Sequence, residues 1–476
     1  MKILHTSDWH LDAKLEQMPR AREHELFFDW LRTTISTEKV DALLVAGDIF
    51  DIPDPSNSAH RRYTEFLRNL FLDVKAGKSR CRNIIIIAGN HDSPAFLTAT
   101  GPLMELLGMY VIAVPTENLR DMIIPLRDTD GKTRSLVAAA PYLRERHLGP
   151  WLEMRDEENR SAEILRAHSR FYRALTDAAL AVREEILTEE GRPETEKIPI
   201  IATGHLFAAH GQTASDDKTR PIVGRLECFP ASEFPEELDY VALGHLHLPQ
   251  KVDGRADVQY SGSPIPLSFT ELSRPKQVLI LETLNESEIN GENKPISVDF
   301  LNTKTKTVTE NATVADTKTV TQKFRIQSLS IPRFQEMKEI QGDFSELKQV
   351  VQELADAREN VWVKAIYTGE TYDLDLRDKI EKLFNQHENV TLLKFENALS
   401  HRSRTTSEAS QHEDLRQLSE TEVFDRFLNT HYSELADPER DELRETFQLL
   451  LESYEIKKQE EAEKIEESDM VKEEVE

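Results

Sequence analysis

The chain has 476 residues, 39% of them hydrophobic, and a formal net charge of −27. Its length predicts two or three domains of roughly 150 residues each, and the lack of any apolar run near the ~20 residues of a membrane span excludes a transmembrane helix. The acidic charge argues against binding of nucleic acid by a basic surface of the chain itself, since most DNA-binding proteins carry a basic excess.

The N-terminus predicts where the protein works, and the cysteines exclude two kinds of site. The N-terminal segment MKILHTSDWHLD lacks the apolar core and cleavage site of a secretory signal, so we expect a cytoplasmic protein. Cys81 and Cys228 are too few for a disulfide framework, and neither has a nearby thiol in the sequence that would complete a zinc site. We expect both to be small buried residues.

The first 270 residues alternate between predicted strands and helices. Several strand-like segments are continuously apolar, which is typical of strands covered on both faces. Strands are predicted at 2–8, 42–48, 83–90, 110–114, 136–142, 199–205 and 240–247, and helices at 22–36, 59–74 and 159–188. This order predicts a layered α/β domain over residues 1–272.

Residues of the metal-binding type stand at the carboxyl ends of five predicted strands. They occur in the motifs TSDWHLD (6–12), GDIFD (47–51), GNHD (89–92), TGH (203–205) and GHLH (244–247). Ligands bind at that edge of an α/β sheet, so we expect these side chains to meet there. Carboxylate, amide and imidazole groups suit manganese or a similar divalent ion.

The pattern favours two metal ions that share one carboxylate. We predict that one ion is held by Asp8, His10 and His247 and the other by Asn90, His205 and His245, with Asp48 between them. Two ions roughly 3.5–4 Å apart hold both sides of an in-line phosphoryl displacement and lower the pKa of a bound water toward ~7.

His91 follows a predicted ligand and is our candidate catalytic residue. It suits protonation of the leaving alkoxide or stabilisation of a pentacovalent phosphorus. We expect Asp92 to orient its imidazole. Glycine precedes the ligands at Gly47, Gly89, Gly204 and Gly244, where we expect the backbone to turn tightly.

Two segments near these motifs have alternative interpretations. Trp9 either stacks on a substrate base or, as we expect, packs in the core beneath the site. The segment Ser261-Gly262-Ser263-Pro264 either holds a substrate phosphate through its N–H and hydroxyl groups or forms an ordinary turn.

A second, smaller α+β domain is predicted over residues 275–400. Strands are expected at 277–284, 323–331, 361–369 and 390–399, helices at 344–357 and 374–387, and a loop or short edge element at 302–320. No catalytic constellation is visible in this region.

The remaining residues predict a polar linker at 401–412, a helical hairpin at 413–456 and an acidic, disordered tail at 457–476. The first hairpin helix opens with a capping box of Ser419 and Glu422. A hairpin this small cannot bury both of its apolar faces. It needs a surface on its own chain or, as we favour, on a partner protein.

The five motifs, in this order and spacing, resemble those of the calcineurin-like metallophosphoesterases, whose fold is a layered β-sandwich flanked by helices. The motifs TSDWHLD, GDIFD and GNHD, and GHLH followed by YSGSPIPLSFTE (260–271), look more specifically like the SbcD family of nuclease subunits. The resemblance is strong over 1–280. It covers 280–400 in layout only, as a capping domain.

The resemblance implies metal ligands at the seven positions named above and a catalytic histidine at His91. Archaeal and eukaryotic relatives place a second histidine where this chain has Asp51. The implied activities are manganese-dependent 3′–5′ exonuclease action on double-stranded DNA and ATP-dependent endonuclease cleavage of hairpins and single strands. The implied processes are DNA replication, recombination and repair.

The resemblance also implies partners. The hairpin stands where relatives bind the coiled-coil base of the SbcC ATPase, in a complex of two copies of each subunit. Dimer contacts are expected from the phosphoesterase domain, with 59–74 and 95–107 as candidates, although core packing explains both segments equally well. DNA binding is then expected despite the acidic net charge, because the bound dications and the SbcC partner supply positive charge. Phosphate contacts are expected from Arg61, Arg62, Arg80 and Arg82.

The same ligand residues are also compatible with two other functions. A phosphomonoesterase would not need the added domain and hairpin. A binding protein that has lost catalysis would not be expected to keep every ligand position filled.

Overall fold

The computed structural model describes residues 1–99, 101–153, 160–193, 196, 198–208, 228–284, 318–321, 323–369 and 375–398, with Phe424, Leu428, Leu443, Arg444 and Phe447. The chain divides into two compact units. The first comprises Met1–Arg220 and Glu227–His401, and the second Pro221–Leu226 and Arg402–Glu476.

A seven-stranded sheet carries the N-terminal strand near its centre, in the order β14-β15-β13-β1-β4-β5-β6. Its parallel strands are β1 (Lys2–Thr6), β4 (Ala42–Ala46), β5 (Asn83–Ile87) and β6 (Met109–Ile112). The antiparallel strands β13 (Gln277–Thr283), β15 (Phe324–Ser330) and β14 (Lys318–Val320) extend it beyond β1.

A six-stranded sheet has the order β11-β12-β10-β9-β8-β7. The four central strands run parallel, and both edge strands are antiparallel. Its members are β7 (Ile123–Arg127), β8 (Thr133–Ala138), β9 (Ile200–His205), β10 (Tyr240–Gly244), β11 (Gln250–Val252) and β12 (Arg255–Tyr260).

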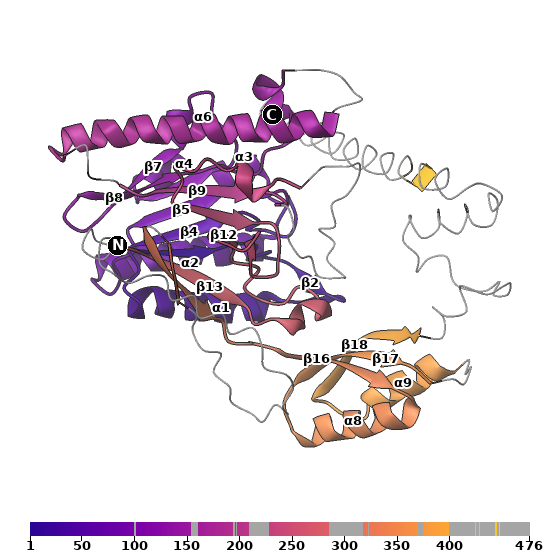
Figure 1. Cartoon of the computed structure of the whole chain (residues 1–476). Coiled ribbons are helices and arrows are strands. Elements are labelled where there is room, and N and C mark those ends of the chain that lie inside the picture. Colours follow the sequence, from indigo (N-terminus) through magenta and orange to yellow (C-terminus); the bar gives the residue numbers. More distant parts are fainter. Residues whose placement is uncertain are drawn as a thin grey trace, which may run out of the picture. The chain divides into compact units, whose positions relative to one another are not determined.

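The two sheets pack face to face, and helices cover their outer faces (Figure 1). Leu44 and Ile85 of one sheet share a buried cluster with Ile201 and Ala242 of the other. Helices α1 (Ala21–Thr37) and α2 (Asn57–Lys75) cover the seven-stranded sheet, and α6 (Arg160–Glu189) covers the six-stranded one. This arrangement confirms the predicted layered α/β fold.

Short elements connect these layers. They are the hairpin β2 (Lys14–Leu15) and β3 (Met18–Pro19), the helices α3 (Pro94–Thr98), α4 (Gly101–Glu105) and α5 (Glu145–Leu148), and the 3₁₀ turns η1 (Leu119–Met122), η2 (Gly149–Trp151), η4 (Ala231–Glu233) and η5 (Phe269–Ser273). The seven strands and three long helices predicted in this region are confirmed, whereas β7, β11 and β12 were not predicted.

Two strands expected in the smaller domain belong instead to the large sheet. β13 pairs with β1 on one side and β15 on the other. The prediction was wrong because local hydrophobicity marks a strand but does not say which sheet completes its hydrogen bonds. The edge element expected within 302–320 is confirmed where the structure describes it, as β14.

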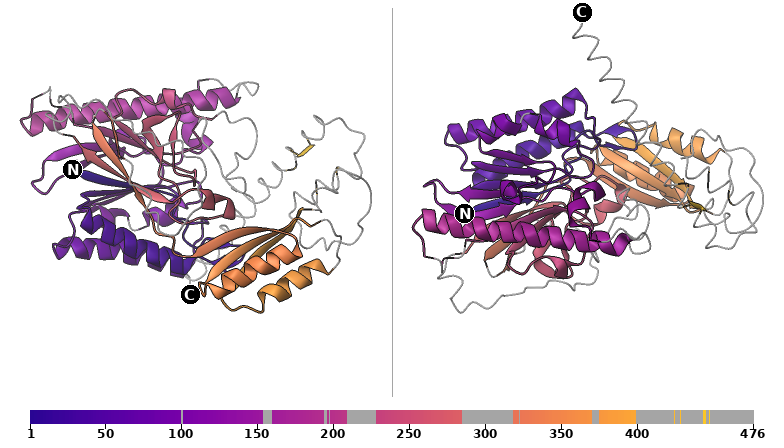
Figure 2. Two further views of the ribbon diagram at one scale, coloured as in Figure 1. Left: turned by 60° about the horizontal axis from the view of Figure 1, so that its bottom comes forward. Right: turned by 90° about the horizontal axis from the view of Figure 1, so that it is seen from above.

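The smaller domain is a separate three-stranded parallel sheet. It consists of β16 (Glu336–Gly342), α8 (Phe344–Asp356), β17 (Val361–Tyr367), α9 (Leu376–Phe384) and β18 (Val390–Asn397). Both helices lie on one face of the sheet (Figure 2) and share a buried cluster with it. The first strand, β16, was not predicted because the charged residues of its sequence EMKEIQG interrupt the apolar pattern.

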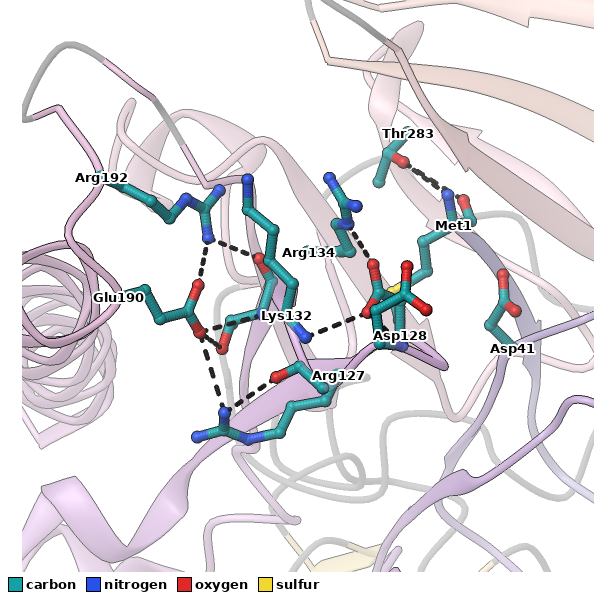
Figure 3. Close-up of polar contacts among 12 residues, drawn as sticks. Met1, Asp41, Arg127, Asp128, Lys132, Arg134, Glu190, Arg192 and Thr283 are labelled. Atoms are coloured by element: carbon teal, nitrogen blue, oxygen red, sulfur yellow. Dashed lines mark hydrogen bonds and ion pairs between the residues drawn. The ribbon is translucent and has the colours of Figure 1, made fainter.

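Polar contacts tie together the ends of several strands at one edge of the sandwich (Figure 3). The Met1 ammonium donates to the Thr283 hydroxyl at 2.9 Å, which joins the start of β1 to the end of β13. Near the start of β8, Glu190 accepts from the Thr133 hydroxyl at 2.7 Å and pairs with Arg192 at 2.9 Å. These contacts hold the edge opposite to the predicted site.

In the second unit, the five described residues are helical. Phe424 and Phe447, one from each predicted hairpin helix, stack with ring centroids 3.9 Å apart. The rest of the predicted hairpin, linker and tail lies outside the described residues. Among the helices of the described chain, none is long and apolar enough for a bilayer. Both cysteines are free; Cys81 is buried, as predicted, and Cys228 half-buried.

The pairing of β13 predicts where the first domain can be cut. A chain ending at residue 272, the boundary expected from sequence, lacks β13. It leaves the edge of β1 unpaired and buried side chains such as Ile3 without the packing of Leu279 and Leu281. We expect it to be insoluble or to lack a cooperative thermal transition. A chain ending at residue 333 keeps β13 and β15 and should unfold cooperatively by circular dichroism. Cooperative unfolding of the shorter chain would contradict the assigned topology.

Candidate metal centre

The predicted ligands lie just beyond the carboxyl ends of strands from both sheets. β1, β4 and β5 are neighbours in one sheet, and β9 and β10 are neighbours in the other. Because the sheets face each other, these strand ends meet at one edge of the sandwich. The side chains brought together there are Asp8, His10, Asp48, Asn90, His91, His205, His245 and His247.

The first predicted group is compact. Asp8, His10 and His247 each offer a ligand atom, and these atoms lie within 4.8 Å of one another. All three side chains are buried, so water does not compete strongly for them. A group of this kind could hold one cation.

The second group is also compact. The Asn90 Oδ1 atom lies 3.0 Å from Nε2 of His205 and 3.1 Å from Nδ1 of His245. Asp48 connects the two groups, because its Oδ2 atom is 3.2 Å from His205 Nε2 and 3.5 Å from His10 Nε2. A carboxylate in that position can bridge two cations.

The far nitrogens of three histidines fix which ring atom faces the centre. His205 Nδ1 donates to the Ala46 carbonyl at 2.9 Å, and since a carbonyl only accepts, Nε2 of the neutral ring keeps its lone pair. His10 Nδ1 meets the Asp51 carboxylate at 3.0 Å, and His247 Nδ1 meets that of Glu271 at 3.3 Å. Metal-ligating histidines are usually held in this way.

One buried atom tests whether this centre fits a cation. Nε2 of His10 is buried and has no hydrogen-bond partner among the residues that the structure describes. A buried polar atom of this kind normally finds a partner, because leaving the bond unmade costs about 1–3 kcal/mol. A metal ion beside Asp8 and Asp48 would be that partner, so the residues present fit the group.

Asp51 and Glu271 are functional candidates that our sequence analysis missed. Both lie within motifs noted for other reasons, GDIFD and YSGSPIPLSFTE. In the sequence, Asp51 stands out only because it replaces the second histidine of some relatives. In the structure it orients a predicted ligand, which no spacing rule reveals because the two residues are 41 positions apart.

The backbone at the ligands is in an unusual conformation. Asp8, His10, Asp48 and His245 have φ of 53°, 46°, 50° and 104°, a region that L-residues avoid. Each such residue costs about 1–3 kcal/mol and persists only where the surroundings enforce it. Hydrogen bonds from Asp8 N to Gly47 O and from His10 N to Asp48 O, both 3.0 Å, supply part of that enforcement.

Asp92 also helps to enforce this backbone conformation. The prediction that it orients His91 was wrong. Its carboxylate accepts from the backbone N–H groups of Ile49, Phe50 and Gly89 at 2.8–3.1 Å. It therefore joins the loops after β4 and β5. His91 is oriented instead by the Asp51 carbonyl, which lies 2.7 Å from its Nδ1.

The charges of the centre respond to burial and to each other. Burial raises the pKa of Asp8, and the charge of Asp48 adds to this. Burial acts to raise the pKa of Asp48 as well, but His205 and His10 hold it well below its usual range. The pKa of His10 rises to about 9 despite burial, because of its hydrogen bond to Asp51 and the charge of Asp48. Because metal ligands must be deprotonated, binding of a cation at this centre would release protons.

Two alternatives left open by the sequence are now decided. Trp9 is fully buried against Phe28 and Phe66, so its predicted core role is confirmed. The hydroxyls of Ser261 and Ser263 are buried and bond within the protein, to Ser7 and to the Ile265 carbonyl. This segment is a structural turn, and its hydroxyls are not free to hold a phosphate.

Three of the arginines expected to contact DNA are engaged in ion pairs. Arg61 pairs with Glu65 at 3.0 Å, Arg62 with Asp12 at 3.4 Å and Arg80 with Asp41 at 2.6 Å. A phosphate would have to compete with these carboxylates.

A cleft of about 460 Å³ opens beside His10, His91 and His247. The β2–β3 hairpin lines it with the exposed Lys14, and β18 of the smaller domain contributes Lys394, which pairs with Glu16 at 3.5 Å. The lining thus combines these two lysines with the carboxylates of Glu16, Asp51 and Glu271.

Comparison with known proteins agrees with this architecture. The family model of the calcineurin-like phosphoesterases matches residues 1–249. A second model, described as the type 5 capsule protein repressor C-terminal domain and labelled SbcD_C, matches residues 333–432. The chain is 31% identical to the SbcD subunit of the nuclease SbcCD from Escherichia coli K12 over 457 residues, which is 95% of this chain and 98% of that protein.

This chain belongs to the SbcD family of calcineurin-like phosphoesterases. The corresponding subunits of the nuclease SbcCD from Rhodobacter capsulatus and Bacillus subtilis are 36% and 35% identical over 290 and 284 residues. In both cases the match covers 59% of this chain and 66% of the relative. The SbcD family assignment therefore rests on matches to the phosphoesterase region and, for the first relative, to nearly the whole chain.

The close packing at Gly244 predicts a sensitive position. A Cβ atom there would lie 1.9 Å from the Ala46 carbonyl oxygen and 2.9 Å from His205 Nδ1. We expect Gly244→Ala to push β10 away from β4, displace His205 and His245, and weaken Mn²⁺ binding at least tenfold in calorimetric titrations. Gly149→Ala is the matched control, because nothing lies within 4 Å of a Cβ at that position. Equal Mn²⁺ affinity in both variants would contradict the described packing.

Proposed function

We propose that this chain is the nuclease subunit of an SbcCD-type complex and hydrolyses phosphodiester bonds in DNA with two Mn²⁺ ions. The observation that supports this most strongly is the position of Asp48 between two compact groups of ligand atoms. One group contains Asp8, and the other contains Asn90. A bridged pair of dications polarises a phosphate and provides a hydroxide at neutral pH.

His91 is the proposed catalytic residue. Its Nδ1 faces the Asp51 carbonyl, which can only accept, so Nδ1 carries a proton. Nε2 is then the nitrogen that receives or gives up a proton during the reaction. A ring nitrogen of His91 lies within 4.8 Å of ligand atoms of His10 and Asp48, close enough to reach a phosphate held there. As the imidazolium, with a second proton on Nε2, His91 would pass that proton to the leaving alkoxide and return to the neutral ring.

The lining of the cleft comes from two different domains, with Lys14 from one and Lys394 from the other. A nucleic-acid backbone presents phosphates at regular spacing and is long enough to contact both, whereas a phosphomonoester is not. Lys394 pairs with Glu16 and Glu396, so a phosphate would have to compete with these carboxylates for it. The net charge of −27 still predicts weak, salt-sensitive DNA binding by the isolated chain.

The finer activities are those that the family resemblance implies. We propose 3′–5′ exonuclease action on double-stranded ends, and endonuclease action on hairpins and single strands that depends on ATP through an SbcC-type partner. We also propose a cytoplasmic complex of two copies of each subunit. Exposed Leu72 of α2 and Leu106 beyond α4, 50% and 83% exposed, fit the dimer contact expected from these helices.

Replacing His91 tests the chemistry. We expect His91→Ala to keep Mn²⁺ binding and to lose cleavage of linear DNA by about 10²–10⁴-fold, the usual contribution of a general acid. Cleavage is measured on an end-labelled duplex with Mn²⁺, and Mn²⁺ binding by calorimetry. Wild-type activity in this variant would overturn the role of His91. Rapid turnover of p-nitrophenyl phosphate by the wild-type chain, without cleavage of DNA, would favour the phosphomonoesterase instead.

Deleting residues 413–476 tests the partner. If the hairpin docks on the ATPase, the shortened chain should keep Mn²⁺-dependent nuclease activity but no longer co-purify with a co-expressed SbcC-type protein. A chain lacking only 457–476 is the control and should still co-purify. Full association of the chain that ends at residue 412 would exclude the hairpin as the docking element.

A further inference from the structure

Glu271 is a buried carboxylate that the proposed reaction does not use. It lies in η5 and is 1% exposed. One oxygen, Oε1, is 3.3 Å from Nδ1 of His247. The other, Oε2, accepts from the Leu267 N–H at 3.1 Å and the Ser263 hydroxyl at 3.2 Å.

Lys276 is the buried cation that balances Glu271. It is 6% exposed, and its Nζ forms an ion pair with Glu271 Oε2. The same ammonium donates to the His247 carbonyl at 3.0 Å and to the Ser263 hydroxyl at 2.8 Å. Lys276 therefore holds the backbone of His247, while Glu271 contacts its ring.

The other ligand histidines are held differently. His205 is fixed by the main-chain carbonyl of Ala46, and His10 by Asp51, whose side chain is 36% exposed. The contact between Glu271 and His247 is shielded from solvent, so charge acts there with less screening. The neighbours of Glu271 in η5, Phe269 and Leu272, pack with Met337 of the smaller domain, which keeps the turn in place.

We propose that Glu271 and Lys276 form a positioning pair that fixes the ring and backbone of His247 and so sets the affinity of the cation held by Asp8, His10 and His247. The inference rests on the proposed two-metal function. Glu271 keeps the proton of His247 on Nδ1 and aims Nε2 at the cation. Removing such a supporting contact typically lowers metal affinity by about 10–100-fold.

Mn²⁺ titration of the full chain, freed of metal with a chelator, tests the pair. Glu271→Gln keeps the shape of the side chain but loses its charge. Glu271→Ala would leave the buried Lys276 without a carboxylate partner and a cavity beside it, which would destabilise the chain. The second variant is therefore Glu271→Met with Lys276→Met, which removes both charges together. The control is Glu163→Gln on α6, another buried carboxylate with cationic partners, Arg166 and Arg170, away from the centre.

We expect the wild-type chain to bind two Mn²⁺ ions. Glu271→Gln and the double variant should each weaken one site about 10–100-fold and leave the other within about threefold. Glu163→Gln should lower the thermal midpoint without changing either affinity. Wild-type affinity at both sites in Glu271→Gln, or in a folded double variant, would overturn the positioning pair alone. Absence of Mn²⁺ binding in the wild-type chain would overturn the proposed function itself.

Discussion

Asp8 and Asp48 are fully buried carboxylates that face a common centre, and this juxtaposition constrains everything around it. Two negative charges out of contact with water are stable only when positive charge lies between or beside them. In the protein alone, burial lowers the pKa values of His10 and His205, but Asp48 and the neighbouring groups raise them to about 9, which favours the protonated rings. Divalent cations would provide more positive charge, and they would displace those protons. The centre is therefore built for cations by its electrostatics as well as by its ligand types.

The fold brings these carboxylates together by joining strand ends. Parallel strands carry their carboxyl ends to the same edge, and the face-to-face packing of the two sheets doubles the number of ends that meet there. The strained backbone of Asp8 and Asp48 turns each side chain back toward the centre immediately after its strand. Asp92 stabilises that geometry from beneath by binding three backbone N–H groups. The strain is local, whereas the packing that maintains it extends through the whole sandwich.

Support for the ligands comes from parts of the chain that are distant in sequence. Glu271 follows the last strand of the six-stranded sheet and reaches His247 with the help of Lys276. The same turn packs against Met337, so the smaller domain borders the centre without supplying a ligand among its described residues. This arrangement gives one half of the centre a rigid, buried support and leaves its other side open to the cleft. Such a division suits the proposed site, which would hold a cation and admit a polymer.

The amino-acid sequence by itself determined the alternating strands and helices of the first 270 residues and the residue types that meet at their ends, because hydrophobic periodicity and ligand chemistry are local properties. It also indicated which residues would share the centre, since carboxyl ends of parallel strands converge. Only the tertiary structure decided that β13 and β15 complete the large sheet and that Asp51 and Glu271 orient His10 and His247. It likewise assigned Asp92 to the backbone rather than to His91. Pairing partners and supporting contacts join residues far apart in the chain, and no local pattern encodes which distant group will satisfy a given hydrogen bond.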